Sequence, residues 1–469
     1  MSPSSRPASK KSARAPVPGM LDMATLARLV KSGEIDTVLT CFPDQQGRLL
    51  GKRVVGRYFL EHVAHEAHAC DYLLATDMEM DTVQGYKASS WELGYGDFLL
   101  QADLSTLRRI PWLPATALVL GDCRDHRGRD LAHAPRSILK RQIARARAMG
   151  FTSKMGSELE FYIFEDGFAQ ARAKDYRALV PPGWYNEDYH IFQTTKEEPL
   201  VRDIRNFMEN AGIPVEFSKG ECGFGQAEIN LRYGEALEMA DRHAIYKNGV
   251  KEIAHAHAKS VTFMAKWDFV QAGSSCHVHN SLWDAKNGRA LFHDPKAPLG
   301  MSKLFRHYLA GQLALAREYV FFLAPFINSY KRFQAGSFAP TKAVWSADNR
   351  TAGFRVCGEG AGLRVECRVP GADANPYLAF AALLAAGLYG IGRELKLEPM
   401  AKGNLYEQKL REIPKTLRDA VDALDKSKVL RAAFGDDVID HYVHTGHIEQ
   451  NEYDKRITDW ELRRYFERG

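Results

Sequence analysis

Apolar and polar residues alternate in short runs along this chain, and longer segments with helical periodicity lie between the runs. Within residues 34–125, the apolar runs DTVLTCF, RLLGKRVV, GDFLLQAD and TALVLGDC are separated by turn sequences such as DQQG and DHRG, a pattern that predicts strands. Later segments predict helices, namely APRSILKRQIARARAMG, GEALEMADRHAIYKNGVKEIAHAHA and MSKLFRHYLAGQLALAREYVFFL. Because strands and helices do not alternate regularly, the pattern predicts an α+β fold and not a doubly wound sheet.

The same pattern divides the chain into a disordered basic tail (1–18), a strand-rich first domain (19–130) and a larger second domain (131–469). The tail, SPSSRPASKKSARAPVPG, has no apolar run that could form the core of a signal peptide. Its acid-free composition also fits an organellar transit peptide, although it lacks a clear amphipathic helix. The apolar segment 376–392 follows an Asn and begins with a Pro, which predicts a buried core helix and not a membrane span.

Charge and cysteine content narrow the class of protein. The 63 basic and 58 acidic residues give a net charge of +5, and four basic residues of the tail account for +4 of it. The rest of the chain is close to neutral, which argues against a partner such as nucleic acid or a membrane surface. The seven cysteines are scattered and never spaced as CxxC, so we expect a reducing compartment such as the cytoplasm.

One short segment, LRVECRV at 363–369, places three charged residues on one face of a predicted strand. Arg364, Glu366 and Arg368 share this face, and the intervening apolar residues share the other. Taken alone, the segment fits a structural ion-pair ladder as well as a functional site. Three other segments bear on the choice, because they carry further acidic residues or histidines. They are SELEFYIF with Glu158 and Glu160, CHVHNSL with His277 and His279, and ECGFGQAEINLRY with Glu221 and Glu228.

Together, these four segments predict a metal and phosphate site. Carboxylate oxygens are preferred ligands of hard divalent cations, and histidine admits Mn²⁺ as well as Mg²⁺. The arginines then need an anion, and a phosphate held between metal ions and guanidinium groups satisfies both requirements. A single pair of alternating acidic residues usually faces solvent, so the inference rests on the conjunction. Neither GxxxxGK[ST] nor a strand-linked GxGxxG occurs, so a nucleotide would be held in another way.

Several longer motifs resemble the glutamine synthetase superfamily, namely NSYKRFQAGSFAP, DNRTAGFR, LRVECRVPGADANPYLAFAALLAAGL, GQAEINLRY, FMAKW and GSSCHVHNSL. The resemblance covers roughly residues 30–465, with the motifs in the family's order. It implies an N-terminal β-grasp domain and a catalytic domain whose antiparallel strands form a funnel. ATP would enter one end and glutamate the other, in a large ring-built homo-oligomer whose sites are shared between subunits.

The resemblance also implies roles for individual residues. Two divalent metal ions, Mg²⁺ or Mn²⁺, would be held in each active site, the first by Glu160, Glu221 and Glu228 and the second by Glu158, His277 and Glu366. His279, Arg350 and Arg355 would contact ATP phosphates, and Arg368 would contact the transferring phosphoryl group. Arg332 and the backbone at Gly273 would bind glutamate. With these groups, ATP would convert the γ-carboxylate of glutamate into a γ-glutamyl phosphate that an amine attacks.

The chain departs from the family on the amine side. Where ammonia-using members carry a flap glutamate in a PGYEAP-like motif, this chain reads AGSFAP and places Phe338, which offers an apolar wall instead of a carboxylate. Ala272 replaces the asparagine that precedes the family's glycine. The aspartate that helps to bind ammonium has two candidates, Asp77 and Asp81, and Tyr189 could also approach the amine.

We therefore expect a relative that ligates an organic amine to glutamate, resembling the γ-glutamylpolyamine, γ-glutamylmonoamine and γ-glutamylanilide synthetases. The alternatives are an ammonia-using glutamine synthetase and a catalytically silent homologue with a structural or regulatory role. Tyr406, in NLYE, resembles a position that some bacterial glutamine synthetases modify with a nucleotide. In HVAHEAH, the spacing of His62, His65 and His68 predicts a packed or solvated helix face and not a metal site.

Overall fold

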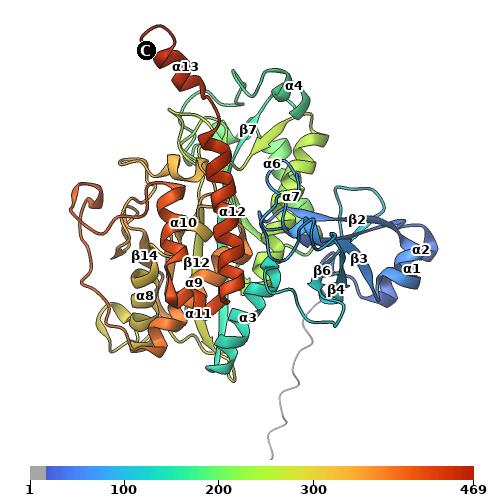
Figure 1. Ribbon diagram of the computed structural model, residues 1–469, viewed down its shortest axis with the longest axis horizontal. Coiled ribbons are helices and arrows are strands. Elements are labelled where there is room, and N and C mark those ends of the chain that lie inside the picture. Colours follow the sequence, from blue (N-terminus) through green and yellow to red (C-terminus); the bar gives the residue numbers. More distant parts are fainter. Residues whose placement is uncertain (1–16) are drawn as a thin grey trace, which may run out of the picture.

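The computed structural model describes residues 17–469, which form two lobes around separate β-sheets (Figure 1). The predicted basic tail, residues 1–18, lies outside the described residues except for its last two. Strands and helices follow one another without regular alternation, which confirms the α+β class. The predicted domain boundary at residue 130 falls in the loop between strand β6 and helix α3, and it stays a prediction.

The first lobe is built on a six-stranded sheet with the order β2-β1-β6-β4-β3, in which β5 also pairs with β6. β1 and β6 run parallel and the other neighbours run antiparallel. Helix α1 (Met23–Ser32) buries Leu26 and Leu29 in the core of this lobe. The strands are β1 (Thr37–Pro43), β2 (Leu49–Val55), β3 (Ala67–Cys70), β4 (Asp97–Ala102), β5 (Arg108–Arg109) and β6 (Thr116–Arg124).

The second lobe contains a nine-stranded sheet with the order β13-β14-β15-β12-β7-β9-β8, and the short strands β10 and β11 also pair with β7. All neighbours are antiparallel except β13 and β14. The strands are β7 (Phe151–Phe164), β8 (Val215–Gly220), β9 (Gln226–Leu231), β10 (Gly234–Glu235), β11 (Ser260–Thr262), β12 (Cys276–Asp284), β13 (Trp345–Ala347), β14 (Phe354–Cys357) and β15 (Arg364–Cys367).

Helices cover this second sheet and share its hydrophobic core. α9 (Pro376–Gly392) coincides with the predicted apolar helix, and nearly all its residues are buried, which confirms a core helix. α8 ends at Leu315, earlier than its predicted segment, and the chain continues in a short 3-10 turn. The helices of this lobe are α3 (Pro135–Ala148), α4 (Phe168–Ala173), α5 (Ile191–Thr195), α6 (Glu198–Asn210), α7 (Ala236–Ala256), α8 (Lys303–Leu315), α9, α10 (Leu417–Asp425), α11 (Lys428–Phe434), α12 (Asp436–Asp454) and α13 (Asp459–Tyr465).

A buried ion network joins the two lobes. The guanidinium of Arg136, at the start of α3, contacts Asp122 of β6 and lies 3.0 Å from a carboxylate oxygen of Asp241 in α7. The hydroxyl of Tyr377 donates to Asp241 at 2.7 Å. Because these charged groups are buried, removing one partner would leave the others uncompensated, so the network fixes how the lobes pack.

The predicted helix across His62, His65 and His68 is wrong. A π-helical turn, η1 (Phe59–Val63), ends before His65, and His68 lies on β3, which pairs with β4. Long-range strand pairing thus overrides the local spacing, because the ladder bonds to β4 satisfy the backbone that a helix would otherwise have satisfied.

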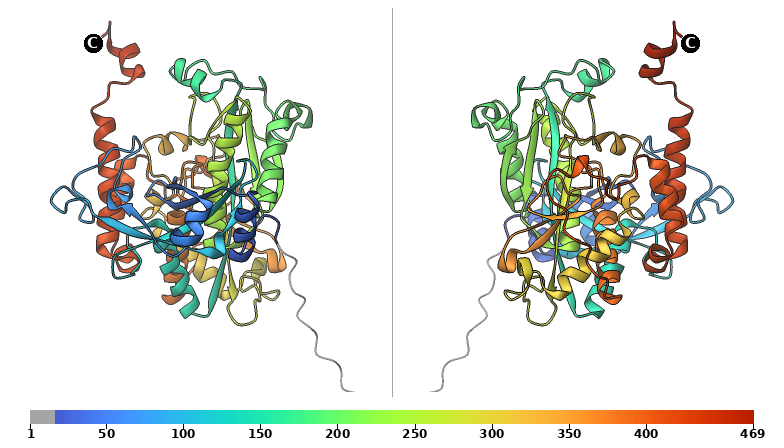
Figure 2. Two further views of the ribbon diagram at one scale, coloured as in Figure 1. Left: turned by 90° about the vertical axis from the view of Figure 1, so that its right-hand side faces the viewer. Right: turned by 90° about the vertical axis from the view of Figure 1, so that its left-hand side faces the viewer.

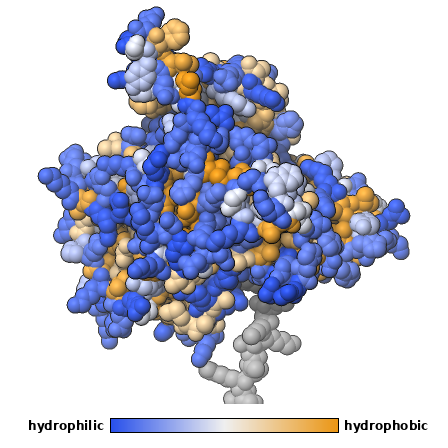
Figure 3. All heavy atoms as spheres, in the orientation of Figure 1, coloured by the Kyte–Doolittle hydropathy of each residue, from blue (hydrophilic) through white to orange (hydrophobic). Residues whose placement is uncertain are grey.

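The surface is largely hydrophilic in the view of Figure 3. In both views of Figure 2, α12 runs along one outer side of the molecule and α13 extends beyond the body. This projecting segment exposes apolar side chains, including those of Leu462 (50%) and Phe466 (85%). Among residues 17–469, no helix has both the length and the apolar character that a membrane span requires, and all seven cysteines are free.

Candidate active site

The polar faces of four neighbouring strands meet on one side of the second sheet. In the register between β12 and β7, His277 lies opposite Glu158, and between β9 and β7, Glu228 lies opposite Glu160. Between β12 and β15, His279 lies opposite Glu366. Since side chains of directly opposite residues point to the same face, strand pairing alone gathers residues from four distant segments.

A first cluster consists of Glu160, Glu221 and Glu228, whose carboxylates each place an oxygen within 4.8 Å of the others. Glu160 accepts the backbone N–H of Ser275 at 2.8 Å, and Glu228 accepts from Asn230 at 2.7 Å. Sequence reasoning missed one member of the surroundings, Lys219, whose ammonium contacts Glu221. The sequence contains a signal for this contact, because Lys219 and Glu221 are two residues apart, and side chains at that spacing in an extended segment point to the same face.

The electrostatics of the first cluster fit a divalent cation. Burial, together with the negative charge of Glu221, raises the pKa of Glu160 to about 7. Burial and the charges of Glu160 and Glu158 raise the pKa of Glu228 to about 9. The raised pKa values of Glu160 and Glu228 show that positive charge nearby does not offset their burial. Carboxylate oxygens from three residues match the ligand preference of Mg²⁺ or Mn²⁺.

We expect Mn²⁺ to bind the first cluster more tightly as the pH rises from about 6 to about 9, with release of protons. The raised pKa values mean that Glu160 and Glu228 hold protons at the lower end of this interval, and a carboxyl group must lose its proton to bind a metal. Calorimetry in two buffers of different ionisation enthalpy measures both quantities. An affinity that stays constant across the interval would contradict the expectation.

A second cluster forms around Glu158. Its carboxylate lies 3.0 Å from Nδ1 of His277 and 2.6 Å from Nε2 of His279. Burial alone would raise the pKa of Glu158, but these two hydrogen bonds and the positive charges of the two histidines hold it well below its ordinary value. Glu158, His279 and Glu366 each offer a ligand atom within 4.8 Å of the others, and Nδ1 of His277 lies 3.6 Å from Glu366. Both imidazoles, and not only the predicted ligand His277, therefore border this position.

Arginines surround Glu366 on its other side. Nη1 of Arg355 lies 2.7 Å from one carboxylate oxygen and Nη1 of Arg368 lies 2.5 Å from the other. Burial alone would raise the pKa of Glu366, but the charges of His277, Arg368 and His279 lower it to about 2. Arg364, which had no predicted role, donates from Nε to Nδ1 of His279 at 2.9 Å. The LRVECRV segment thus contributes one carboxylate and two guanidinium groups to the second cluster, and the neighbouring strand β14 contributes the guanidinium of Arg355.

Two predicted glutamate-binding positions lie side by side. Arg332 is 3% exposed, and its guanidinium donates to the carbonyls of Val369 at 3.0 Å and Arg368 at 2.9 Å. A Cβ atom at Gly273 would lie 2.7 Å from Cγ of Arg332, so the close approach of these two segments requires glycine. The adjacent carbonyl, that of Ala272, accepts from the hydroxyl of Tyr162 at 2.7 Å.

Phe338 lies in an exposed flap between η6 (Asn328–Arg332) and β13. Its side chain is 57% exposed and faces an open hollow whose lining includes Asp348, Arg350 and Met400. The structure thereby brings the predicted amine-side residue Phe338 next to Arg350, a predicted phosphate contact.

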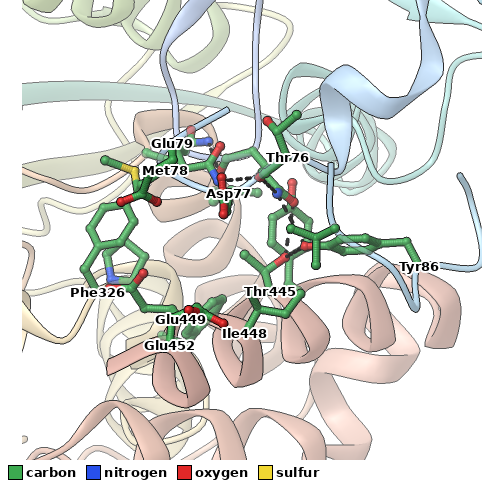
Figure 4. Close-up of a pocket in the computed structure, with 18 of the residues that line it drawn as sticks. Thr76, Asp77, Met78, Glu79, Tyr86, Phe326, Thr445, Ile448, Glu449 and Glu452 are labelled. Atoms are coloured by element: carbon green, nitrogen blue, oxygen red, sulfur yellow. Dashed lines mark hydrogen bonds between the residues drawn. The ribbon is translucent and has the colours of Figure 1, made fainter. Parts of the chain in front are cut away.

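Of two other residues predicted on the amine side, Asp77 lies apart from the carboxylate clusters and Tyr189 lies at the edge of the first cluster. Asp77 lies in a loop above α12, where it lines a cavity with Glu79, Glu449 and Glu452 (Figure 4). Among residues 17–469, no hydrogen bond or ion pair joins Asp77 to a carboxylate of either cluster. Tyr189 is 68% exposed, and its ring centroid lies 4.4 Å from the Lys219 ammonium, at the edge of the first cluster.

Comparison with known proteins places this geometry in context. The family described as "Glutamine synthetase, catalytic domain" matches residues 132–465. A gamma-glutamylethanolamide synthetase, GlnA4 of Streptomyces coelicolor, is 48% identical over 469 residues, covering 100% of both chains. A glutamate–isopropylamine ligase of a Pseudomonas species is 36% identical over 443 residues, covering 93% of this chain and 96% of the relative. A solved structure described as apo GmaS without ligand has a TM-score of 0.82 at 28% identity, covering 94% of this chain and 99% of that one.

Proposed function

Since the chain belongs to the glutamine synthetase family, we propose that it is an ATP-dependent ligase that joins an organic amine to the γ-carboxylate of L-glutamate. We choose an organic amine over ammonia because the chain is similar over its full length to a gamma-glutamylethanolamide synthetase. A second relative acts on isopropylamine, which also bears an alkyl group. An apolar flap residue, Phe338, suits such substrates better than a carboxylate would.

The proposed reaction has two steps, and it needs no reactant besides glutamate, ATP and the amine. An oxygen of the γ-carboxylate attacks the γ-phosphorus of ATP, and ADP leaves, so that a γ-glutamyl phosphate forms. The uncharged amine then attacks the carbonyl carbon, phosphate leaves, and the nitrogen loses a proton. Arg355 and Arg368 are placed to orient the anionic groups and to neutralise the charge that develops on the phosphoryl oxygens.

We assign one divalent cation, Mg²⁺ or Mn²⁺, to each carboxylate cluster. Glu160, Glu221 and Glu228 would hold the first, and Glu158, His277 and Glu366 the second, with His279 bordering the same position. Bound there, such cations would polarise the phosphate oxygens. The protein's own part is to bring the acceptor carboxylate and the nucleotide together and to keep water away from the acyl phosphate.

We further propose that the chain assembles into a ring-built homo-oligomer in which neighbouring subunits complete each site. The position of Asp77 supports this proposal, since its loop packs over α12 and not beside the clusters of its own chain. The exposed apolar side chains of α13 also support assembly, because isolated projecting apolar segments are costly in water. Within such an assembly, Asp77 would serve the amine side of a neighbouring site.

A panel of nucleophiles tests the proposed function. Phosphate release and amide formation are measured with ATP, Mg²⁺ and glutamate in the presence of ethanolamine, isopropylamine, an aromatic amine, a polyamine or ammonia. We expect at least one organic amine to exceed ammonia in kcat/KM by about tenfold, the scale of discrimination that one apolar contact gives. If ammonia is the best substrate across the panel, the chain is an ammonia-using enzyme. If no nucleophile supports turnover, the alternative of a silent homologue gains support.

The variant Phe338→Glu should shift this preference toward ammonia by about tenfold in the ratio of kcat/KM values. A carboxylate on the flap can attract ammonium and accept its proton, and it removes the apolar wall. The matched control is Ala335→Glu, which places the same charge on an exposed position of the same flap. Equal effects of the two variants would show that charge on the flap matters and that the Phe338 side chain does not.

A further inference from the structure

The backbone of the flap, residues 334–339, is held in an unfavourable conformation. Gly336 has a φ of 77° and Phe338 a φ of 56°, both in the left-handed region. Glycine adopts this region readily, but an aromatic residue with a Cβ does so at a cost in free energy. Such a conformation persists only if surrounding contacts maintain it, so the flap needs an anchor.

The contacts within the flap do not supply this anchor. Gln334 and Ser337 bond to each other and to Lys331 and Arg332, all within the same short segment. Among residues 17–469, one hydrogen bond ties residues 334–339 to a segment distant in the chain. In this bond the hydroxyl of Tyr406 donates to the carbonyl of Ala339 at 3.0 Å. Ala339 directly follows Phe338, so the bond acts next to the strained residue.

Tyr406 is itself rigidly placed, so it can act as an anchor. It lies in the 3-10 turn η8 (Leu405–Glu407), and the side chain of Asn404 accepts its backbone N–H at 3.2 Å. The neighbouring Leu405 is fully buried in a small apolar cluster with Val344 and Ala352. The hydroxyl therefore reaches the flap from a turn that this small apolar cluster holds in place.

The flap held by this bond lies beside a predicted phosphate contact. Phe338 and Arg350 line the same open hollow. The hydroxyl of Tyr406 therefore acts on the segment that places Phe338 next to the predicted phosphate side of the site.

We propose that Tyr406 is a positioning residue that holds the flap closed over the reacting carboxylate, so that the amine and not water reaches the acyl phosphate. This inference rests on the proposed function. When the flap is loose, a water oxygen bonds to the carbonyl carbon, the bond from that carbon to the phosphate oxygen breaks, and a proton is released. The products are glutamate and phosphate, so ATP is consumed without amide.

The variant Tyr406→Phe tests the proposal because it removes one hydroxyl and keeps the ring. We expect the ratio of phosphate released to amide formed to rise above one, and the KM for the amine to rise by about fivefold, the effect of one lost hydrogen bond. The kcat at saturating amine should fall by less than about twofold, since no group that touches the phosphoryl group is removed. Tyr453→Phe is the matched control, because Tyr453 is 38% exposed and its hydroxyl makes no hydrogen bond within residues 17–469.

A second measurement separates failure of this proposal from failure of the proposed function. Hydrogen exchange of the backbone amides of residues 333–341 requires no turnover, and it should accelerate in Tyr406→Phe but not in Tyr453→Phe. The partition between water and nucleophile can be measured with ammonia if ammonia proves the best substrate. Unchanged exchange together with an unchanged ratio of phosphate to amide would overturn the role of Tyr406, whichever amine the enzyme uses.

Discussion

Replacing Arg368 with methionine should lower kcat by about 10³- to 10⁵-fold, the range observed when an arginine that stabilises a transferring phosphoryl group is lost. The Arg368 side chain is 6% exposed and its Nη1 lies 2.5 Å from Glu366. It is thus a preorganised positive charge in a site with little water, where such a charge has its largest effect. The loss should appear in kcat more than in the KM for ATP, because the interaction strengthens as charge develops in the transition state.

The variant Arg364→Met, on the same strand, provides the comparison. Arg364 bonds to His279 and to the carbonyl of Gly362, so it acts on the site through another residue. We expect its effect on kcat to be about 10- to 100-fold, the range typical of groups that orient a catalytic or ligand side chain. Single-turnover measurements of acyl phosphate formation distinguish the two. Equal losses in both variants would contradict a direct role of Arg368 in phosphoryl transfer.

Replacing Glu228 with glutamine should inactivate the enzyme and at the same time stabilise the metal-free protein. The side chain is 5% exposed, and its carboxyl has a pKa of about 9 compared with an ordinary value of 4.5. A folded state that binds a proton more tightly than the unfolded chain loses stability as the pH rises between these two values. Glutamine carries no charge to bury, so its advantage should grow over the same interval by about 1 kcal/mol for each pH unit.

Thermal unfolding with and without Mg²⁺ measures this effect. Without metal, the variant should unfold at a higher temperature than the parent protein, and with saturating Mg²⁺ the order should reverse because the parent gains binding energy. Glu216→Gln is the matched control, since Glu216 lies exposed on the neighbouring strand β8. Amide formation by the Glu228 variant should fall by at least about 10³-fold. A metal-free variant that is less stable than the parent protein would contradict the electrostatic account of the cluster.

Local sequence pattern predicted much of the sheet that carries the site. Alternation in LRVECRV and SELEFYIF identified which side chains share a face, because the period of two is a property of any strand. It did not identify which strands are neighbours. β12 and β7 are separated by more than a hundred residues and β15 lies later still, so their pairing depends on contacts that no local pattern encodes. The resemblance to a known family supplied that information.

The residues that sequence reasoning missed depend on the same long-range geometry. Arg364 lacked a predicted role because its partner His279 is on another strand. The motif around Tyr406 resembles a site of nucleotide modification, whereas the hydrogen bond from Tyr406 to Ala339 joins segments 67 residues apart. For the helix predicted around His65, local spacing was outweighed by the pairing of β3 with β4. Each difference arises where a non-local contact decides the conformation of a local segment.

The single bond between Tyr406 and the flap also bears on how new enzymes can be derived from this chain. Most of the proposed metal ligands lie on paired strands of one sheet, so a change in one strand disturbs several of them together. Among residues 17–469, one hydrogen bond, at the carbonyl of Ala339, ties the flap to a distant segment, and the exposed flap positions can vary independently. A directed-evolution library confined to residues 334–338 is therefore expected to vary the amine preference and to leave the proposed metal ligands unchanged.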